Sequence, residues 1–349
     1  MTRIAVDAMG GDYAPEEIVK DAVWAASEHN VAIELVGQID KIQPILDKIA
    51  KNGIRSNRGG YFIKTIRVDM SKLDIKLTQA DEIIEMGEAV GVAIRKKKNS
   101  SIVLAVDAVV KGSSDAVVAA GSTGAAMASS LFGLGRIKGI ERPAIATTLP
   151  TKKEPVILID AGANSACTPE MLFQFATMGS TFAKNVYGRQ NPRIAVLNIG
   201  EEEGKGNQLV KDTHKLLKEN QIGLNFVGNI EGKELFQGDV DVIVCDGFVG
   251  NVALKTIEGC SMMLFKLIQQ EFRSSWISSI VGMLAKPFMR RLYKKINYEE
   301  FGGALLLGVK GITVISHGRS SSYAIKNAVR VAKEAVEAEV NKKIAELIK

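Results

Sequence analysis

The stretch Ile4-Ala5-Val6-Asp7-Ala8-Met9-Gly10-Gly11-Asp12 decides the fold class of this chain of 349 residues. An apolar strand over Arg3–Val6 runs directly into a loop of small residues with two carboxylates, and a helical pattern follows from Pro15. A strand that ends in this way places polar groups at the carboxyl edge of a sheet, where open α/β folds bind ligands. The stretch therefore predicts an α/β fold with a ligand site built from strand ends.

Short apolar strands alternate with helical patterns along the rest of the chain. Their β-branched residues on both faces predict a buried, mostly parallel sheet, with the helices as crossovers. Besides Arg3–Val6, the expected strands are Ile33–Val36, Ala116–Ala119, Pro155–Ile159, Arg193–Asn198, Leu224–Val227, Val240–Cys245 and Thr313–Ile315. We expect residues 1–349 to form a single α/β domain.

Two segments interrupt this alternation. Residues 52–65, with Arg55, Arg58, Gly59 and Gly60, are expected to form an exposed basic loop. Residues 260–298 concentrate large apolar side chains in a helical region that Pro287 interrupts, more than one helix face needs. Apolar anchors beside a basic end are typical of interfacial helices. We therefore expect a helical excursion that contacts a second subunit or a membrane surface, with plain core packing as the alternative.

The composition narrows the class of protein. Three cysteines without metal-ligand spacing predict a reduced, cytoplasmic protein. The N-terminus lacks the long apolar run of a signal peptide. The net charge of +6 weakly favours an acidic partner or an anionic surface. Nucleic acid is not expected, because the basic residues are not interleaved with aromatic ones and no known nucleic-acid module is present.

Loops of one kind follow five of the expected strands. Their glycines, hydroxyls and helix N-termini can hold an anion without a metal, and Lys205 and Lys255 add positive charge. Any one of them is also an ordinary turn or helix cap. We expect all five loops to lie on one edge of the same sheet, and together they predict a single anion-binding cleft. The loops are Val6–Asp12, Ala120–Ala125, Asp160–Asn164, Gly200–Asn207 and Cys245–Asn251. None matches the dinucleotide or P-loop pattern.

Two further features have a structural and a functional interpretation. His317 follows the last expected strand and can act as an acid, a base or a phosphate contact, or can simply bond a backbone carbonyl. The run Arg95-Lys96-Lys97-Lys98 ends a helical pattern. Cations stabilise a helix C-terminus, so a solvated helix end explains the run, and docking of an acidic partner protein is the alternative.

Taken together, these motifs resemble the bacterial phosphate acyltransferases that convert acyl-acyl-carrier-protein and inorganic phosphate to acyl-phosphate. The resemblance covers nearly the whole chain, although the segment Arg55–Ile66 departs from it. It is carried by Ile4–Pro15, Ala120–Ala125, Arg136–Ile140 with Arg142–Ala144, Asp160–Asn164, Lys205–Asn207, Phe226–Asn229, Asp246–Asn251 and Gly302–Ala304.

The resemblance implies a Rossmann-like three-layer α/β/α sandwich similar to isopropylmalate dehydrogenases and phosphate acetyltransferases. It implies a homodimer that acts without a metal or nucleotide cofactor at the start of phosphatidic acid synthesis. It also implies peripheral association with the inner face of the cytoplasmic membrane, where a glycerol-3-phosphate acyltransferase takes over the product. The acidic acyl carrier protein is then a partner for the basic residues Arg95, Lys96, Lys97, Arg136 and Lys138.

The chemistry expected of such a site is direct attack of phosphate on the thioester carbonyl. A covalent acyl-enzyme is not expected, because no serine or cysteine has an evident base beside it. We predict as catalytic residues Lys205, Asn207, Asn229, Asp246 and Asn251. We predict as substrate-binding residues Asp7, Gly10, Gly11, Asp12, Ser122, Thr123, Gly124, Asn164, Gly247, Lys255 and His317. The aspartates are expected to orient loops and lysines rather than to move protons, because a carboxylate facing phosphate repels it.

Two other functions remain as alternatives. The first is a metal- and NAD-dependent dehydrogenase of the isopropylmalate type, which needs clustered aspartates for its metal ion. The second is a non-catalytic scaffold that holds a membrane complex through residues 260–298.

Overall fold

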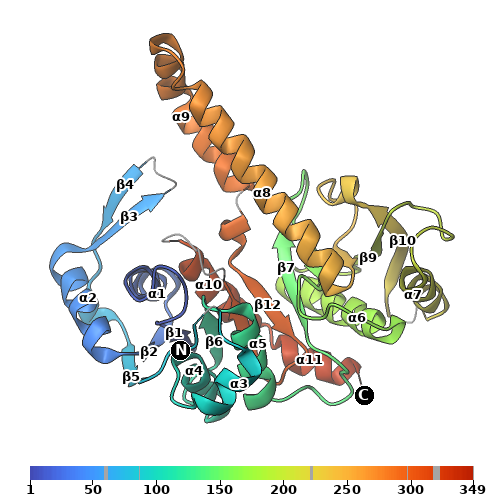
Figure 1. Cartoon of the computed structure of the whole chain (residues 1–349), viewed down its shortest axis with the longest axis horizontal. Coiled ribbons are helices and arrows are strands. Elements are labelled where there is room, and N and C mark those ends of the chain that lie inside the picture. The colour runs from blue at the N-terminus through green and yellow to red at the C-terminus, as the bar shows by residue number, and fades with distance from the viewer. Residues whose placement is uncertain (59–61, 86, 221–222, 297, 317–322, 349) are drawn as a thin grey trace.

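The computed structural model describes residues 1–58, 62–85, 87–220, 223–296, 298–316 and 323–348, and an eleven-stranded sheet runs through it (Figure 1). Its order is β10-β9-β11-β8-β7-β12-β13-β6-β1-β2-β5. The strands are β1 Arg3–Asp7, β2 Ala32–Gly37, β5 Ile75–Gln79, β6 Ala116–Ala119, β7 Ala144–Leu149, β8 Val156–Ile159, β9 Arg193–Asn198, β10 Asn225–Glu231, β11 Val242–Val244, β12 Ala304–Leu307 and β13 Ile312–Ile315. The expected strands are present, and most pairings are parallel, as predicted.

Five strands were not expected from the sequence. Three of them, β5, β7 and β12, belong to the main sheet. The other two, β3 (Ile54–Arg58) and β4 (Phe62–Ile66), form an antiparallel hairpin in which Ile54 pairs with Ile66. The expectation of an exposed loop over residues 52–65 is therefore wrong, because Ile54–Arg58 and Phe62–Ile66 pair with each other as strands.

The strands β7 and β12 reverse the direction of the sheet. β7 pairs antiparallel with β8, and β12 pairs antiparallel with both β7 and β13. As a result β5, β2, β1, β6 and β13 run one way, whereas β8, β11, β9 and β10 run the other way. The loops after β1 and β6 thus lie on one edge of the sheet, and those after β8, β9 and β11 lie on the opposite edge. The prediction that all five loops share one edge is wrong.

Helices cover both faces of the sheet, so the predicted three-layer sandwich is confirmed (Figure 1). One face is covered by α1 (Glu16–His29), α2 (Ile39–Asn52), α6 (Pro169–Val186), α7 (Gln208–Glu219), α10 (Ala324–Glu337) and α11 (Val340–Leu347). The other face is covered by α3 (Val90–Lys96), α4 (Ser101–Val110), α5 (Thr123–Gly133) and α8 (Gly247–Glu271). Three short 3₁₀ turns complete the chain, η1 (Met70–Lys72), η2 (Gly232–Glu234) and η3 (Tyr298–Phe301).

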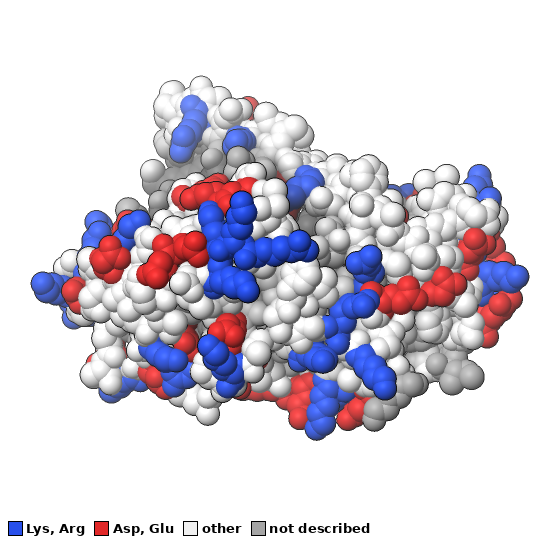
Figure 2. Space-filling view, turned by 60° about the horizontal axis from the view of Figure 1, so that its bottom comes forward, with Lys and Arg blue, Asp and Glu red and all other residues white. Residues whose placement is uncertain are grey.

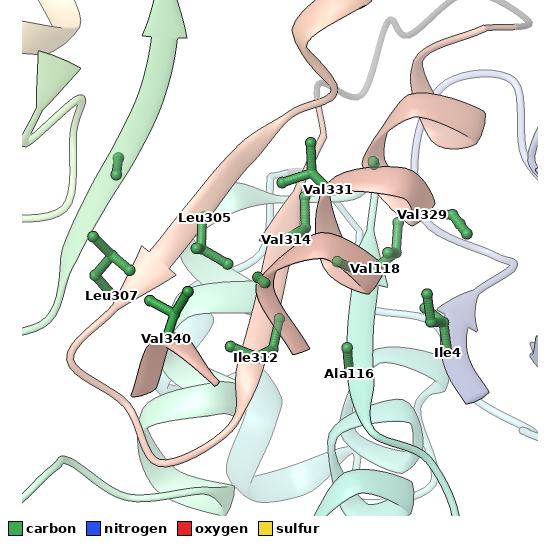
Figure 3. Close-up of a cluster of buried hydrophobic side chains, with 14 of the residues drawn as sticks. Ile4, Ala116, Val118, Leu305, Leu307, Ile312, Val314, Val329, Val331 and Val340 are labelled. Atoms are coloured by element: carbon green, nitrogen blue, oxygen red, sulfur yellow. The ribbon is translucent and has the colours of Figure 1, made fainter. Parts of the chain in front are cut away.

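Alternation along each strand fills two separate cores. In β1, Ile4 and Val6 enter the first core while Ala5 enters the second, because successive side chains of a strand point to opposite faces. Figure 3 shows part of the first core, where Val314 of β13 and Val118 of β6 lie against Val329 and Val331 of α10. Burial on both faces is the physical reason why these strands are apolar throughout.

The end of α8 and the helix α9 (Trp276–Ile296) project from the body of the molecule as a helical hairpin (Figure 1). The rings of Phe265 and Tyr293 pack edge to face across it, with centroids 5.1 Å apart. Large apolar side chains along it are exposed, among them Trp276 at 75% and Leu284 at 72%. Plain core packing therefore does not account for these residues. Among the described residues, no helix is long and apolar enough to cross a membrane.

Candidate functional site

A cavity of about 280 Å³ lies between α5 and α8, above the strands at which the sheet reverses direction. Both halves of the sheet contribute to its wall, since α5 follows β6 and α8 follows β11. Its lining residues are Thr123, Gly124, Met127, Ile145, Thr147, Thr148, Ala161, Gly162, Asn251, Leu254, Lys255, Phe301, Gly303, Ala304, Ile315, Ser316 and Ala324. Four predicted site residues, Thr123, Gly124, Asn251 and Lys255, are thus brought together in one cavity.

The N-terminus of α5 forms one end of the cavity. Ser122 caps this helix, because its hydroxyl accepts a hydrogen bond from the N–H of Ala125 at 3.3 Å. Thr123 and Gly124 come next, and N–H groups in the first turn of a helix have no partner within the helix. These groups and the positive end of the helix dipole make this part of the wall suited to an anion such as phosphate.

The first two turns of α8 form the facing wall. Asn251 and Lys255 are four residues apart and so share one face of the helix. The Lys255 ammonium donates a hydrogen bond to the Glu258 carboxylate at 2.8 Å, with the lysine half-exposed and the glutamate buried. An amide donor and a cation therefore face the N-terminus of α5 across a cavity whose remaining wall is largely apolar.

Asp160 organises the floor beneath Asn251. Its carboxylate accepts backbone hydrogen bonds from Ile145 at 3.2 Å, Ala163 at 2.8 Å and Asn164 at 2.8 Å. The Asn164 side-chain amide donates to the same carboxylate and to the carbonyl of Pro143, each at 2.8 Å. Burial raises the pKa of Asp160, and these hydrogen bonds act in the opposite direction. The predicted residue Asn164 thus supports the site from below.

Two glycines let α8 approach this floor. A Cβ on Gly250 would lie 2.0 Å from the Asp160 carbonyl oxygen, and one on Gly247 would lie 2.7 Å from the backbone of Asn164. The N–H of Gly247 donates to the Asn164 carbonyl at 2.7 Å. Asp246 caps α8 by accepting from the N–H groups of Phe248 and Val249, each at 3.0 Å. Gly247 and Asp246 therefore position the helix that carries Asn251 and Lys255.

The strand β7 supplies the wall that the sequence analysis did not predict. Thr147 and Thr148 both line the cavity, and the Thr148 hydroxyl hydrogen-bonds that of Tyr187 at 2.8 Å. Phe301 and Gly303 close another side. The β-branched residues after Pro143 signal a strand in the sequence, and Gly302-Gly303 belong to a motif shared with the family.

The loop after β1 lies behind the N-terminus of α5. A Cβ on Gly10 would be 2.8 Å from the backbone nitrogen of Gly121, so the two loops meet through their glycines. Asp7 is buried and accepts from the N–H of Met9 at 3.1 Å, and burial raises its pKa. Gly11 has a positive φ of 101°, and Asp12 is exposed. This loop packs against Gly121, the residue before the Ser122 cap, and does not line the cavity.

Three residues predicted as catalytic lie elsewhere. Asn207 caps α7, accepting from the N–H of Val210 at 2.9 Å. Asn229 bonds Nδ1 of His214 at 3.1 Å and donates to the carbonyl of Glu202 at 3.3 Å. Lys205 is exposed in the loop between β9 and α7. These residues occupy the end of the sheet formed by β9 and β10, and none of them lines the cavity.

The basic residues predicted to dock a carrier protein form two groups. Arg95 and Lys96 are exposed at the end of α3, whereas Lys97 bonds the Ile83 carbonyl at 2.7 Å and the carboxylate of Glu88. Arg136 and Lys138 are exposed in the loop that follows α5. His317 lies outside the described residues. Within the described part of the chain, no three His, Cys, Asp or Glu side chains come together to hold a metal ion.

Comparison with known proteins identifies the family of this chain. Residues 2–343 match the family described as "Fatty acid synthesis protein". The chain is 50% identical over 345 residues to a phosphate acyltransferase of Dictyoglomus thermophilum, covering 99% of this chain and 97% of that one. A phosphate acyltransferase of Heliobacterium modesticaldum is 51% identical, covering 96% and 94%. The chain belongs to the phosphate acyltransferase family. It is therefore an acyltransferase, and the resemblance seen in the sequence is confirmed.

Solved structures show the same fold at low sequence identity. A phosphotransacetylase from Streptococcus pyogenes has a TM-score of 0.61 at 18% identity, covering 96% of this chain and 94% of that chain. The EutD phosphotransacetylase from Staphylococcus aureus has a TM-score of 0.58 at 15% identity, covering 97% and 94%. 4-Hydroxythreonine-4-phosphate dehydrogenases also share the fold, with a TM-score of 0.52 for one from Salmonella typhimurium, at 15% identity over 95% of this chain and 98% of that chain. The curated relatives nevertheless favour neither the dehydrogenase nor the scaffold alternative.

Proposed function

We propose that this acyltransferase transfers an acyl group from the thioester of an acyl carrier protein to inorganic phosphate. The products are acyl-phosphate and the free carrier thiol. The observation that carries the proposal is the cavity in which the N-terminus of α5 faces Asn251 and Lys255. The helix end and the lysine suit a phosphate, and the apolar wall beside them, with Met127 and Leu254, suits an acyl chain.

The reaction proceeds by direct attack. A phosphate oxygen held by the N–H groups of Thr123 and Gly124 adds to the thioester carbonyl. The resulting oxyanion is stabilised by the Asn251 amide, with the Lys255 ammonium neutralising the phosphate. Collapse breaks the C–S bond, and the thiolate leaves without strong acid assistance because a thiol has a pKa of about 8.5. Positioning and electrostatics thus supply most of the rate.

The exposed hairpin of α8 and α9 is the part of the enzyme that contacts a second subunit or a membrane. Its apolar side chains and basic residues suit either the second subunit of a homodimer or the inner face of the cytoplasmic membrane. Membrane contact brings the water-labile acyl-phosphate close to a membrane glycerol-3-phosphate acyltransferase that consumes it.

The test is release of free carrier thiol from acyl-carrier-protein with and without inorganic phosphate. We expect release that depends on phosphate and yields one acyl-phosphate, trapped as a hydroxamate, for each thiol. Release without phosphate, or a stable acylated enzyme formed from the carrier alone, contradicts direct attack.

A further inference from the structure

A surface groove of about 670 Å³ lies at the C-terminal end of α5, apart from the cavity. Its lining residues are Leu131, Phe132, Gly135, Arg136, Glu141 and Arg142. Phe132 is 65% exposed and places a large apolar side chain among the charged residues of the groove. The body of the molecule that carries α5 lies toward the bottom of Figure 1, the side that Figure 2 brings forward, and basic side chains gather there in several groups among acidic ones.

The cations beside Phe132 are carried by a fixed loop. Arg136, Lys138 and Arg142 are exposed there, against one exposed acid, Glu141. The Arg136 guanidinium donates to the carbonyls of Ile140 and Glu141, which fold the loop around it. Gln174 of α6 braces the same loop, donating to the Gly139 carbonyl and accepting from the N–H of Glu141, each at 2.9 Å. The groove is therefore a preorganised surface with an apolar centre and a basic rim.

Two elements join this groove to the cavity. Leu131 lines the groove and Met127 lines the cavity, and because they are four residues apart they share one face of α5. Arg142 lines the groove, and Ile145, which is three residues farther along the chain at the start of β7, lines the cavity. At about 3.3 Å per residue, that separation is about 10 Å. A flexible arm bound along the Leu131–Met127 face can thus pass from one to the other.

We infer that this groove docks the carrier protein, an acidic protein that presents its acyl thioester on a flexible arm. The inference rests on the proposed function and adds where the partner binds. The basic rim complements an acidic partner, Phe132 supplies an apolar anchor, and α5 guides the arm into the cavity. A second copy of this chain that docks through the same groove fits less well, because the basic residues Arg136, Lys138 and Arg142 of the two copies would face each other.

The test compares palmitoyl-carrier-protein with palmitoyl-pantetheine as thioester substrates of the full-length enzyme. The double variant Lys138→Glu/Arg142→Glu reverses two rim charges. The matched control, Lys41→Glu/Lys51→Glu, makes the same charge change at exposed positions on α2. We expect the ratio of kcat/KM for the carrier substrate to that for the pantetheine substrate to fall about tenfold or more in the rim variant, and to stay within about twofold in the control. The neutral variant Phe132→Ser should lower the same ratio.

Other results overturn the inference. An equal loss on both substrates means that the rim only supports the fold, and an unchanged ratio places the docking surface elsewhere. Binding of fluorescently labelled carrier protein, followed by anisotropy, does not depend on catalysis. One outcome separates the two proposals: the wild-type enzyme binds the carrier and the rim variant does not, but neither thioester reacts with phosphate. In that case the groove is the docking surface and the proposed function is wrong. Equal binding by the wild type and the rim variant overturns the groove whatever the kinetics.

Discussion

Asp160 accepts hydrogen bonds from both the backbone N–H and the side-chain amide of Asn164, each at 2.8 Å. This pair ties the loop after β8 to the carbonyl of Pro143 at the start of β7, and α8 rests on it through Gly247. Neither residue lines the cavity, yet together they set the height of Asn251 above the sheet. The wall of the proposed site that carries Asn251 is thus positioned by a buried carboxylate.

The Asp160→Asn variant should lose stability. An amide in this position turns a donor NH₂ group toward N–H donors, leaving buried groups unsatisfied, so we expect a loss of about 2 to 4 kcal/mol in the free energy of unfolding. Urea unfolding measures it. The control Asp107→Asn removes an exposed ion pair to Lys111 one helical turn away and should cost about 0.5 kcal/mol or less. Equal losses in the two variants would falsify the role given to Asp160.

Alanine substitutions at Gly250 and Gly259 of α8 should change the stability of the protein in opposite directions. Alanine at Gly250 would place its Cβ 2.0 Å from the Asp160 carbonyl, so we expect Gly250→Ala to cost about 3 kcal/mol or more. No atom lies within 4 Å of a Cβ at Gly259, so Gly259→Ala should stabilise the helix by about 0.5 to 1 kcal/mol. Thermal unfolding should shift in opposite directions, and a Gly250→Ala variant as stable as the wild type contradicts the close packing of α8.

Lys255 should control phosphate binding. Replacing it by methionine removes the cation that faces the N-terminus of α5, and we expect the KM for phosphate to rise about tenfold, the value of one charged hydrogen bond. Lys266→Met, an exposed lysine farther along the same helix, is the control and should leave this constant unchanged. Lys205→Ala deserves the same measurement, because Lys205 was predicted to hold the phosphate. A larger effect at Lys205 than at Lys255 would move the phosphate site toward β9.

A negative charge placed on the apolar surface of the α8–α9 hairpin should weaken its binding to a membrane or to a second subunit. Leu284 is 72% exposed, and Leu284→Glu places a carboxylate within the apolar surface. We expect either weaker flotation with anionic vesicles or dissociation of a dimer in sedimentation velocity, and the assay that changes identifies the occupant. Ser279→Glu adds the same charge at an exposed polar position of α9 and should change neither. No change in either assay for Leu284→Glu means that this surface has no partner.

Cys167 should react slowly with alkylating reagents at neutral pH. Burial, together with the nearby charge of Asp160, raises the pKa of its thiol from 9.0 to about 11. Below that pKa the thiolate fraction grows about tenfold per pH unit, so labelling by iodoacetamide should accelerate about a hundredfold between about pH 8 and about pH 10. Peptide mass spectrometry measures this rate, with the exposed Cys260 of α8 as an internal control that is labelled faster at the lower pH. A rise of only about tenfold over this range, which a thiol with the ordinary pKa of 9.0 would give, contradicts the shift.

The sequence by itself determined the fold class, the family and most of the strands. Apolar residues on both faces of Arg3–Asp7 or Arg193–Asn198 require burial from two sides, which only a helix-covered sheet provides. It also singled out Thr123, Gly124, Asn251 and Lys255, which line the cavity, since glycine and polar residues beside a helix start are a local signal. The hairpin β3–β4 is not evident from the sequence, because two strands of five residues carry little periodicity.

The tertiary structure decided which of these residues meet. The direction of a strand is not encoded in its own residues but in its pairing, and the antiparallel strands β7 and β12 send the two halves of the sheet in opposite directions. The loops that look alike in the sequence therefore separate onto opposite edges. Lys205 and Asn229 lie away from the cavity, because β9 and β10 stand at the end of the sheet. Thr147 and Thr148 of β7 line it, because the cavity forms over the reversal itself.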